Sequence, residues 1–583
     1  LSGGLDQFGD NLKFRFELRN LTEEEIELLL AKLEEYQCLG MLEPQSPQER
    51  LDVFLRLADK QLLVALYEAT QGKLLEDILV DEYHRILLTE AQELYLIVCT
   101  LHQFRVGVRA GLVRRLTGVN FEQFRGRLLG PLTGIVSADY DTGPRDYVYR
   151  ARHSHIAGIV FNNILSTHSQ RVNQFLRILD AIDPSYSSDN AALRELINWR
   201  NVRDLSPNIE DGRRILATAL NAAGEEPFIL QQMALLEMNS STGNLKSARE
   251  YLDRAQDIAP WDRTLKHSRA NLLGREANAA NDGLIAKSLR GDAKKLLREL
   301  RSDRADPYVS SLNAQLAIDE LREILPSRTA EPAPEKEALV LRLITDAEQA
   351  LSEGLSRSPE FQNLILQSSR LRALLGEGDK AERFLANALA RQAHLEFVAI
   401  AYAKAIRNRD LPTAISAVRT ALQHKSTSKP LNQMLFDLMM QEADDHRDEL
   451  SGSLRRSFTD GDGNTVMHVH AVRYHFLRGD RAAFEHARTT ASNMQVARKD
   501  KDRPRLPFMN RDTKDGRFVG DITSLGEAYG FVTVPSLLDR MYLRPIASCD
   551  ADVWETLRQG SKVSFVMTFN ARGAIASEVR RLD

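Results

Sequence analysis

This sequence has little cysteine, no excess of charge of one sign, and no long apolar run. Its 3 cysteines, Cys38, Cys99 and Cys549, are far apart and odd in number, which argues against a disulfide framework or a zinc site and fits a reducing cytosol. The net charge of −4 gives no global basic field that would favour nucleic acid. No apolar stretch reaches the roughly 18 residues that cross a membrane, and the chain does not open on a signal peptide. We expect a cytoplasmic protein without a membrane partner and without a bound metal.

The remaining composition is that of a globular protein with several domains. Hydrophobic residues make up 43% of the chain and charged residues 27%. Helical patterns dominate residues 154–495. Residues 515–583 carry short alternating apolar segments separated by glycine turns, which are typical of an all-β module. The predicted fold class is therefore mainly α, with a small β-barrel at the C-terminal end.

Small residues recur at a regular spacing through the helical region. The steps are 34 and 33 residues, at two positions seven residues apart. The residues are Ala347, Ala381 and Ala414 at the first position, and Gly354, Ala388 and Ala421 at the second. A related pair, Ala248 and Ala255, lies 99 residues upstream of the first, close to three more periods. The pattern is typical of tetratricopeptide repeats, whose second helices pack too closely for bulky side chains. It predicts an α-solenoid that presents a long binding surface; the alternative is a helical bundle with chance alanine spacing.

Residues 91–167 predict a winged helix. The segments "EAQELYLIVCTLHQF", "RAGLVRRL" and "NFEQFRGRLL" form three helices, and "GIVSADY" and "YVYRARH" form a hairpin around a Gly-Pro turn. A winged helix that reads DNA usually needs a clustered basic face. Here Asp139, Asp141 and Asp146 lie among the arginines of the wing. An intramolecular clamp is therefore favoured over a DNA reader.

The order of segments in the first third resembles a STAND-class P-loop NTPase, the group that includes the NACHT and apoptotic ATPases. "LRNLTEEEIELLLAKL" (18–33) is similar to the turn and lid helix of that class, and residues 95–136 are similar to its winged helix. The resemblance covers residues 10–170. It implies the end of an NTPase core and a helical lid before the winged helix. Residues 12–18 alternate as a strand, and a lone strand needs partners, so we expect this chain to be the C-terminal part of a longer polypeptide.

The resemblance implies ATP or ADP with Mg²⁺ in the full-length protein, but no complete nucleotide site here. No G-x-x-x-x-G-K-[ST] loop occurs in the sequence, and such a loop cradles the phosphates. The ATPase, and an effector such as a nuclease, protease or NADase, would lie upstream. In this class a winged-helix histidine often touches the β-phosphate of ADP, which implies His153, with Arg152 beside it, as nucleotide-sensing residues. The alternative is that His153 caps the next helix or packs in a core.

Residues 511–583 resemble a cold-shock domain, which is an OB-fold barrel. "GRFVGDITSLGEAYGFVTV" is similar to its first three strands, "RMYLRP" to its second aromatic strand, and residues 557–582 to its closing strands. The resemblance implies four residues that would bind single-stranded nucleic acid: Tyr529, Phe531, Tyr542 and Arg544. Aromatic rings at such positions stack on bases. However, the segment holds ten basic and ten acidic residues, whereas a binder wants a positive groove. A barrel that docks a protein therefore stays open as an alternative.

We predict the sensor and regulatory portion of a STAND NTPase of the prokaryotic antiviral-defence type. Its repeats would recognise a trigger such as a viral protein, and recognition would license ATP-dependent oligomerisation and activation of an upstream effector. The alternatives are an RNA-binding scaffold made of the repeats and the barrel, and a transcription regulator. The predicted domains are the core end and lid (1–90), the winged helix (91–167), the tetratricopeptide-like repeat sensor (168–495), a linker (496–510) and the cold-shock-like barrel (511–583).

Overall fold

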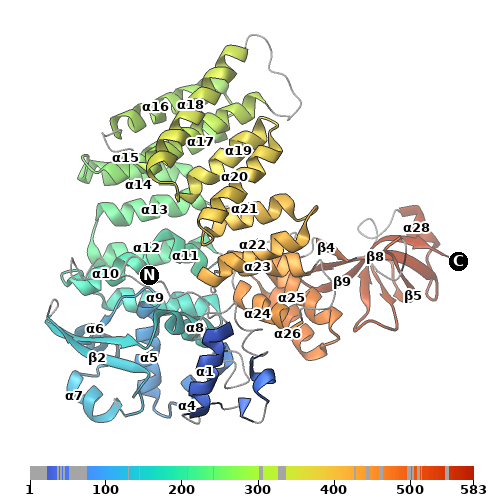
Figure 1. The fold of residues 1–583 in the computed structure, drawn as a ribbon, viewed down its shortest axis with the longest axis horizontal. Coiled ribbons are helices and arrows are strands. Elements are labelled where there is room, and N and C mark those ends of the chain that lie inside the picture. Colours follow the sequence, from blue (N-terminus) through green and yellow to red (C-terminus); the bar gives the residue numbers. More distant parts are fainter. Residues whose placement is uncertain are drawn as a thin grey trace. The chain divides into compact units, whose positions relative to one another are not determined.

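The fold is mainly helical, with tetratricopeptide-like repeats and a five-stranded β-barrel at the C-terminal end, as the sequence predicts (Figure 1). The computed structural model describes residues 23–35, 39, 42–43, 46–51, 75–128, 130–142, 145–206, 208–240, 242–300, 306–325, 336–425, 428–440, 447–458, 464–494, 501, 505–508, 513, 515–544 and 551–582. The strand predicted at 12–18 lies outside these residues. The chain divides into two compact units, Leu1–Asp81 with Glu320–Arg447, and Glu82–Asp319 with Asp448–Asp583.

The first unit contains antiparallel helix pairs that follow one another in sequence. Its helices are α1 (Glu23–Glu35), α18 (Glu337–Arg357), α19 (Gln362–Leu374), α20 (Gly378–Arg391), α21 (Glu396–Ile406), α22 (Leu411–His424) and α23 (Lys429–Met439). Helix α19 packs on α20, α20 on α21, α21 on α22, and α22 on α23. One core cluster, formed by Ile365, Leu385, Leu395 and Val398, joins three successive helices of this stack and the turn before α21.

The second unit begins with the winged helix. Its elements are α5 (Thr89–His102), β1 (Val108–Arg109), α6 (Ala110–Thr117), α7 (Phe121–Gln123), the π-helical turn η3 (Phe124–Leu128), β2 (Val136–Asp141) and β3 (Asp146–Ala151). The sheet order is β1-β3-β2, and β2 and β3 form the hairpin that the sequence predicts. The third helix differs from the prediction, because it is a single turn that widens into η3. Helix α4 (Leu75–Arg85) precedes these elements and crosses from the first unit into the second.

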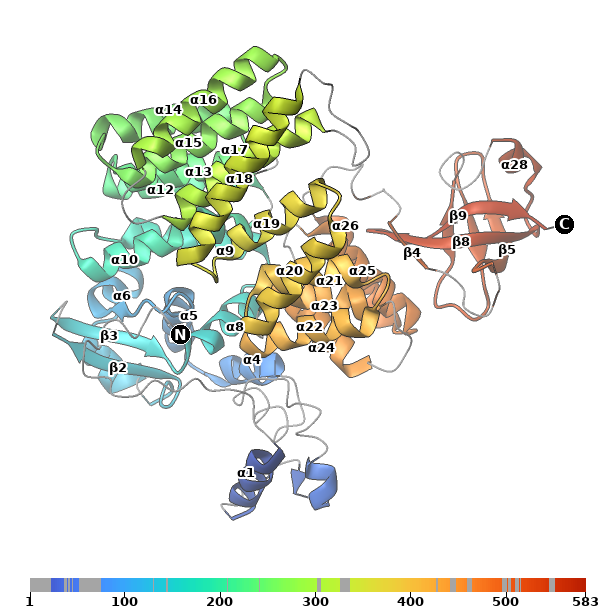
Figure 2. The same cartoon turned by 45° about the horizontal axis from the view of Figure 1, so that its top comes forward.

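Helices continue directly from the winged helix into the repeats of the same unit. They are α8 (Ser154–Ile164), α9 (His168–Ala181), α10 (Ser187–Leu196), α11 (Trp199–Leu205), α12 (Ile209–Ala223), α13 (Pro227–Asn239), α14 (Leu245–Ile258), α15 (Arg263–Ala279), α16 (Gly283–Leu300) and α17 (Pro307–Ile324), of which the last crosses the unit boundary. Figure 2 shows α13–α16 as stacked antiparallel helices. Helix α6 packs on α9, α9 on α12, and α12 on α13, so one continuous packing path joins the winged helix to the repeats.

The periodic small residues lie where the steric argument requires them. Ala248 and Ala255 are fully buried on α14, and Ala414 and Ala421 are fully buried on α22. Ala347 and Gly354 are buried on α18. On α20, Ala381 is buried and Ala388 is half-buried. The second helix of each pair therefore uses these positions to approach its neighbours closely.

The spacing between the two groups of small residues corrects one expectation. The 99 residues between Ala248 and Ala347 contain two repeat steps, from α14 to α16 and from α16 to α18, and not three. The missing member is the pair Ala286 and Ala293 on α16, which is buried and has the same separation of seven residues. The steps of 38 and 61 residues are irregular, which hides this pair from a search at a fixed period.

Replacing Ala414 by leucine is expected to destabilise the first unit by about 1–3 kcal/mol. Ala414 is 0% exposed on α22, so three added carbon atoms must displace packed neighbours. The free energy of unfolding from urea denaturation measures the effect. Ala390→Leu is the matched control, because Ala390 lies on the exposed side of α20, and a surface change there should stay within about 0.5 kcal/mol. Equal effects at the two positions would contradict the close-packing argument.

The C-terminal barrel has the strand connectivity of an OB fold. After α24 (Arg447–Ser457), α25 (Thr465–Leu477) and α26 (Arg481–Asn493) come β4 (Arg505–Phe508), β5 (Phe518–Leu525), β6 (Gly530–Thr533), β7 (Met541–Leu543), α28 (Ala551–Thr556), β8 (Lys562–Asn570) and β9 (Gly573–Arg581). Strands β5, β6, β7, β9 and β8 close a five-stranded ring, in which β7 and β9 are parallel, and β4 pairs with the outside edge of β8. Five strands in this Greek-key order are the OB arrangement.

The helix pair α25–α26 docks on one end of the barrel. The rings of Phe476 and Phe569 lie 5.5 Å apart, edge to face. The hydroxyl of Ser492 donates to the carbonyl of Ala571 at 3.2 Å. Helix α25 packs on β4, β8 and β9 (Figure 1). The helix pair therefore covers the side of the barrel that these strands form.

Acidification is expected to destabilise this docked helix pair through His470. The side chain is 2% exposed, and burial, followed by the nearby Arg473, lowers the pKa of His470 from 6.5 to about 3. Between pH 6.5 and 3, His470 therefore binds a proton in the unfolded chain but not in the folded chain. The contribution of neutral His470 to the free energy of unfolding is fully present above pH 6.5. It falls as the pH drops toward 3, by up to about 1.4 kcal/mol per pH unit. Urea denaturation on both sides of pH 6.5 measures the slope. His470→Leu should flatten it, whereas His424→Leu, at an exposed position, should leave it unchanged.

Candidate functional site

The aromatic residues predicted to bind nucleic acid come together on the outer face of the barrel. Residues alternate along β6 and β7, so Val532, Met541 and Leu543 point into the core. Phe531 and Tyr542 are direct cross-strand partners on the other face. We call the surface formed by Tyr529, Phe531 and Tyr542 the aromatic platform.

The rings of the aromatic platform form one contiguous surface. The centroids of Tyr529 and Tyr542 lie 6.0 Å apart with nearly parallel planes. Phe531 lies edge-on to both rings, 5.9 Å from Tyr529 and 5.8 Å from Tyr542. Tyr529 is 50% exposed although it is a large aromatic residue. Phe531 and Tyr542 are half-buried, so Tyr529 is the ring of the platform most open to stacking by a base.

Two arginines supply positive charge at the aromatic platform. The guanidinium carbon of Arg544 lies 5.9 Å from the centroid of the Tyr542 ring. That of Arg540 lies closer, 3.9 Å above Phe531. Arg540 was not predicted from the sequence. Its signal was present, because residues 540 and 544 flank β7 in the same alternation as residue 542 and so share its face. An acidic residue opposes this positive charge, because Asp521 is exposed on the neighbouring β5.

The second predicted site lies where the last wing strand meets α8. His153 is the N-cap residue of α8, and its Nδ1 accepts a hydrogen bond of 3.1 Å from the backbone N–H of His155. The helix-capping role considered from the sequence is therefore present. In the neutral imidazole the remaining nitrogen, Nε2, then carries the proton and can donate to an anion. Arg152 forms an ion pair with Glu82. The roles of His153 and Arg152 in nucleotide sensing stay predictions.

Basic side chains lie near His153 at the start of α8. Burial, followed by Arg105, lowers the pKa of His153. Burial, followed by Arg150 and His153, lowers the pKa of His102 to about 4. Arg105 has φ of 64°, a backbone conformation that residues other than glycine rarely adopt. The junction thus brings Arg105 near a histidine with a lowered pKa, and N–H donors of this kind suit an oxyanion.

Two further arginines of the winged helix form ion pairs within it. Arg150 lies 3.6 Å from the carboxylate of Asp141 and 4.0 Å from that of Asp139. On the third helix, Arg127 pairs with Glu90 at 3.0 Å. A DNA reader needs its basic side chains turned toward phosphates. These pairs therefore favour the clamp interpretation over DNA reading.

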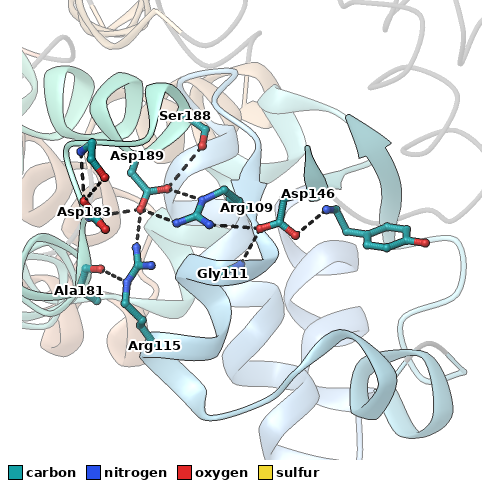
Figure 3. Close-up of polar contacts among 10 residues, drawn as sticks. Arg109, Gly111, Arg115, Asp146, Ala181, Asp183, Ser188 and Asp189 are labelled. Atoms are coloured by element: carbon teal, nitrogen blue, oxygen red, sulfur yellow. Dashed lines mark hydrogen bonds and ion pairs between the residues drawn. The ribbon is translucent and has the colours of Figure 1, made fainter. Parts of the chain in front are cut away.

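A buried carboxylate, Asp189, joins the winged helix to the first helices behind it (Figure 3). Asp189 is 1% exposed on α10. Its Oδ1 accepts from Arg109 Nε at 3.2 Å, and its Oδ2 accepts from Arg115 and, at 3.3 Å, from the backbone N–H of Asp183. Arg109 also reaches Asp146 on the wing, at 3.3 Å. We call this set the Asp189 network.

An aromatic ring packs against the guanidinium of Arg109 in the Asp189 network. The guanidinium carbon of Arg109 lies 3.6 Å from the centroid of the Tyr186 ring. The side chain of Arg109 is 7% exposed, so its charge depends on these partners and not on water. Arg109 and Asp189 are 80 residues apart in sequence, and sequence reasoning did not find them, because no local pattern pairs residues at that distance.

No metal site or membrane-crossing helix is found in the described part of the chain. Its His, Cys, Asp and Glu residues form no group of three or more that could hold a metal ion. Among the described helices, none is long and apolar enough to span a bilayer.

Comparisons with known proteins give distant likenesses. No family model matches this chain, and no curated protein matches it. A tetratricopeptide-repeat protein of Thermus thermophilus is 18% identical, covers 37% of this chain and 99% of its own, and has a TM-score of 0.27. Human IFIT1, solved as a dimer with m7Gppp-AAAA, is 17% identical, with coverage of 56% and 73% and a TM-score of 0.27. A STAND protein with a tetratricopeptide-repeat sensor from Pyrococcus horikoshii is 16% identical, with coverage of 76% and 72% and a TM-score of 0.19. At these identities and TM-scores, the likenesses carry no argument about function.

Proposed function

We propose that this chain is the sensor and regulatory portion of a STAND NTPase, in which a trigger bound to the repeats moves the winged helix. The supporting observation is the Asp189 network. Arg109 belongs to the winged helix and Asp189 to the helices that follow. Separating them would leave buried charges unpaired, which is strongly unfavourable. A displacement of the helical region is therefore passed on to the winged helix.

The proposed switch has two states that nucleotide and trigger favour differently. ADP, held by a P-loop upstream of this chain, would accept a hydrogen bond from His153 and keep the winged helix closed. A trigger protein would bind the repeats of the open state more tightly, which is the condition for shifting such an equilibrium. ATP with Mg²⁺ would then support self-association and activation of an upstream effector in antiviral defence.

The experiment uses the full natural polypeptide that contains this chain. The nucleotide retained through purification is released by denaturation and identified by chromatography. We expect bound ADP in the unaltered protein, and its loss, with increased self-association, in His153→Ala. His155→Ala is the control, because His155 bonds to His153 through its backbone N–H, which alanine keeps. The proposal would be wrong if the full polypeptide has no P-loop, or if both variants retain ADP equally.

A second function is favoured by the barrel: binding of single-stranded nucleic acid on the aromatic platform. The specific observation is that three predicted aromatic residues, of which Tyr529 is exposed and the other two are half-buried, lie in contact with Arg540 and Arg544 beside them. Stacking on such a surface tolerates any base, because every base has a π-face. This function is compatible with the switch, since the barrel could present nucleic acid to a STAND sensor, and it is also the basis of an RNA-binding scaffold.

Fluorescence anisotropy with labelled oligonucleotides tests this second function on the intact chain. We expect single-stranded oligo(rU) to bind more tightly than a duplex of the same length, because a duplex keeps its bases stacked on each other. The affinity should fall as salt is raised, since arginines contact phosphates. Equal binding of both probes, or no binding of either, would leave the barrel as a protein-docking module.

A further inference from the structure

We propose that a nucleic-acid strand bound on the aromatic platform continues beyond the barrel onto the start of α26, where Arg481 and Arg540 hold its phosphates. This inference rests on the nucleic-acid function proposed for the barrel. It extends that site to a helix that the cold-shock resemblance does not include. The ligand is a single-stranded polyanion longer than the aromatic platform itself.

The geometry brings Arg481 to the edge of the aromatic platform. Its Nη2 donates a hydrogen bond of 2.8 Å to the carbonyl of Leu538, in the loop between β6 and β7. Arg540, two residues further on, covers the Phe531 ring. Both arginines are exposed. A guanidinium has five N–H donors, so the bond to Leu538 orients Arg481 and leaves most of its donors able to face a phosphate.

The docking of α25–α26 fixes Arg481 relative to the barrel. Phe476 packs on Phe569, and Ser492 bonds to Ala571. Gly573 lies beside α26, where an added Cβ would be in ordinary van der Waals contact with the Phe484 ring, at 3.8 Å. The helix pair is therefore part of the same rigid module as the aromatic platform. A rigid donor binds a ligand with less loss of conformational entropy than a flexible tail would.

The helix pair supplies charge that the barrel lacks. Residues 511–583 hold equal numbers of basic and acidic residues, whereas residues 465–493 hold four arginines and two carboxylates. The acidic residues adjacent in sequence to these two arginines accept hydrogen bonds from backbone N–H groups: Asp480 from Ala483, and Asp539 from Arg540. A net positive extension of this kind would track the backbone of a strand whose bases stack on the rings.

The test is a length series of oligo(rU) and oligo(dT) from about four to sixteen nucleotides, the range of site sizes for one OB fold, measured by anisotropy on the intact chain. The unaltered protein should gain affinity with length beyond the shortest probe. Arg481→Gln should lower the affinity for the longest probe by about threefold or more and leave the affinity for the shortest probe unchanged. It should also lower the slope of log K against log salt by about one. Arg481→Lys should restore the slope. Lys246→Gln, at an exposed position on α14, controls for the loss of one surface charge.

The outcomes separate this inference from the function on which it rests. If the unaltered chain binds no probe of any length, the nucleic-acid function fails and the extension fails with it. If the chain binds but Arg481→Gln matches it at every length, the extension is wrong and the aromatic platform stands alone. If Arg481→Gln weakens the shortest and longest probes equally, Arg481 acts by holding the loop at Leu538, which also overturns the extension.

Discussion

Asp189→Ala is expected to lower the free energy of unfolding of the second unit by about 3–5 kcal/mol, the usual cost of removing one partner from a buried ion pair. The carboxylate is 1% exposed and receives two arginines and a backbone N–H. Without it, Arg109 keeps only Asp146 as a charged partner, and its guanidinium is too buried for water to compensate. Urea denaturation gives the free energy of unfolding, and hydrogen exchange followed by mass spectrometry shows which helices lose stability.

The control for Asp189 is an ion pair of the same chemistry at the surface. Asp204 pairs with Arg203, and both side chains are about half exposed, so Asp204→Ala should cost no more than about 1 kcal/mol. The exchange pattern tests the coupling itself. In Asp189→Ala we expect protection to fall in α6 and α10 together. A loss confined to α10 would mean that the network stabilises one helix without joining two elements.

The winged helix and the repeat helices could be predicted because their signals are local. The wing strands alternate with period two, and small residues on second helices recur with the repeat. The features that could not be predicted depend on short elements, irregular spacing or contacts between distant residues. The third helix widens into η3 at Phe124, and β1 has only two residues. Both elements are too short to give a periodic pattern of apolar residues in the sequence. The irregular steps around Ala286 concealed one repeat, and the ion pair of Arg109 with Asp189 depends on tertiary folding.

The candidate sites were predictable to different degrees for the same reason. Phe531 and Tyr542 lie on two adjacent strands and Tyr529 directly precedes the first of them, so alternation predicts a shared face, and the structure brings the three together. The position of Arg481 beside Leu538 could not be predicted, because it depends on how a helix pair docks on the barrel. The capping bond of His153 depends on one side-chain rotation at the start of α8. Sequence therefore predicts surfaces made by one strand pair better than sites assembled from separate elements.

The combined variant Tyr529→Ala, Phe531→Ala and Tyr542→Ala is expected to abolish binding of single-stranded nucleic acid. Each stacked base contributes about 1–3 kcal/mol on an aromatic side chain, so losing three rings should weaken binding by more than about a hundredfold. The fold should survive, because the core of the barrel is formed by residues on the opposite face, such as Val532 and Met541. Circular dichroism and thermal unfolding check that the barrel is intact.

The choice of control decides whether stacking is the cause. Tyr140→Ala removes a tyrosine that is 57% exposed on the wing, away from the platform residues in sequence and in sheet, and it should leave the affinity unchanged. Tyr529→Phe keeps the ring and should retain most of the binding. The salt dependence separates the two contributions, since rings do not release counterions. If the triple alanine variant binds as tightly as the unaltered chain, with the same salt slope, then the arginines alone hold the ligand and base stacking has no part in recognition.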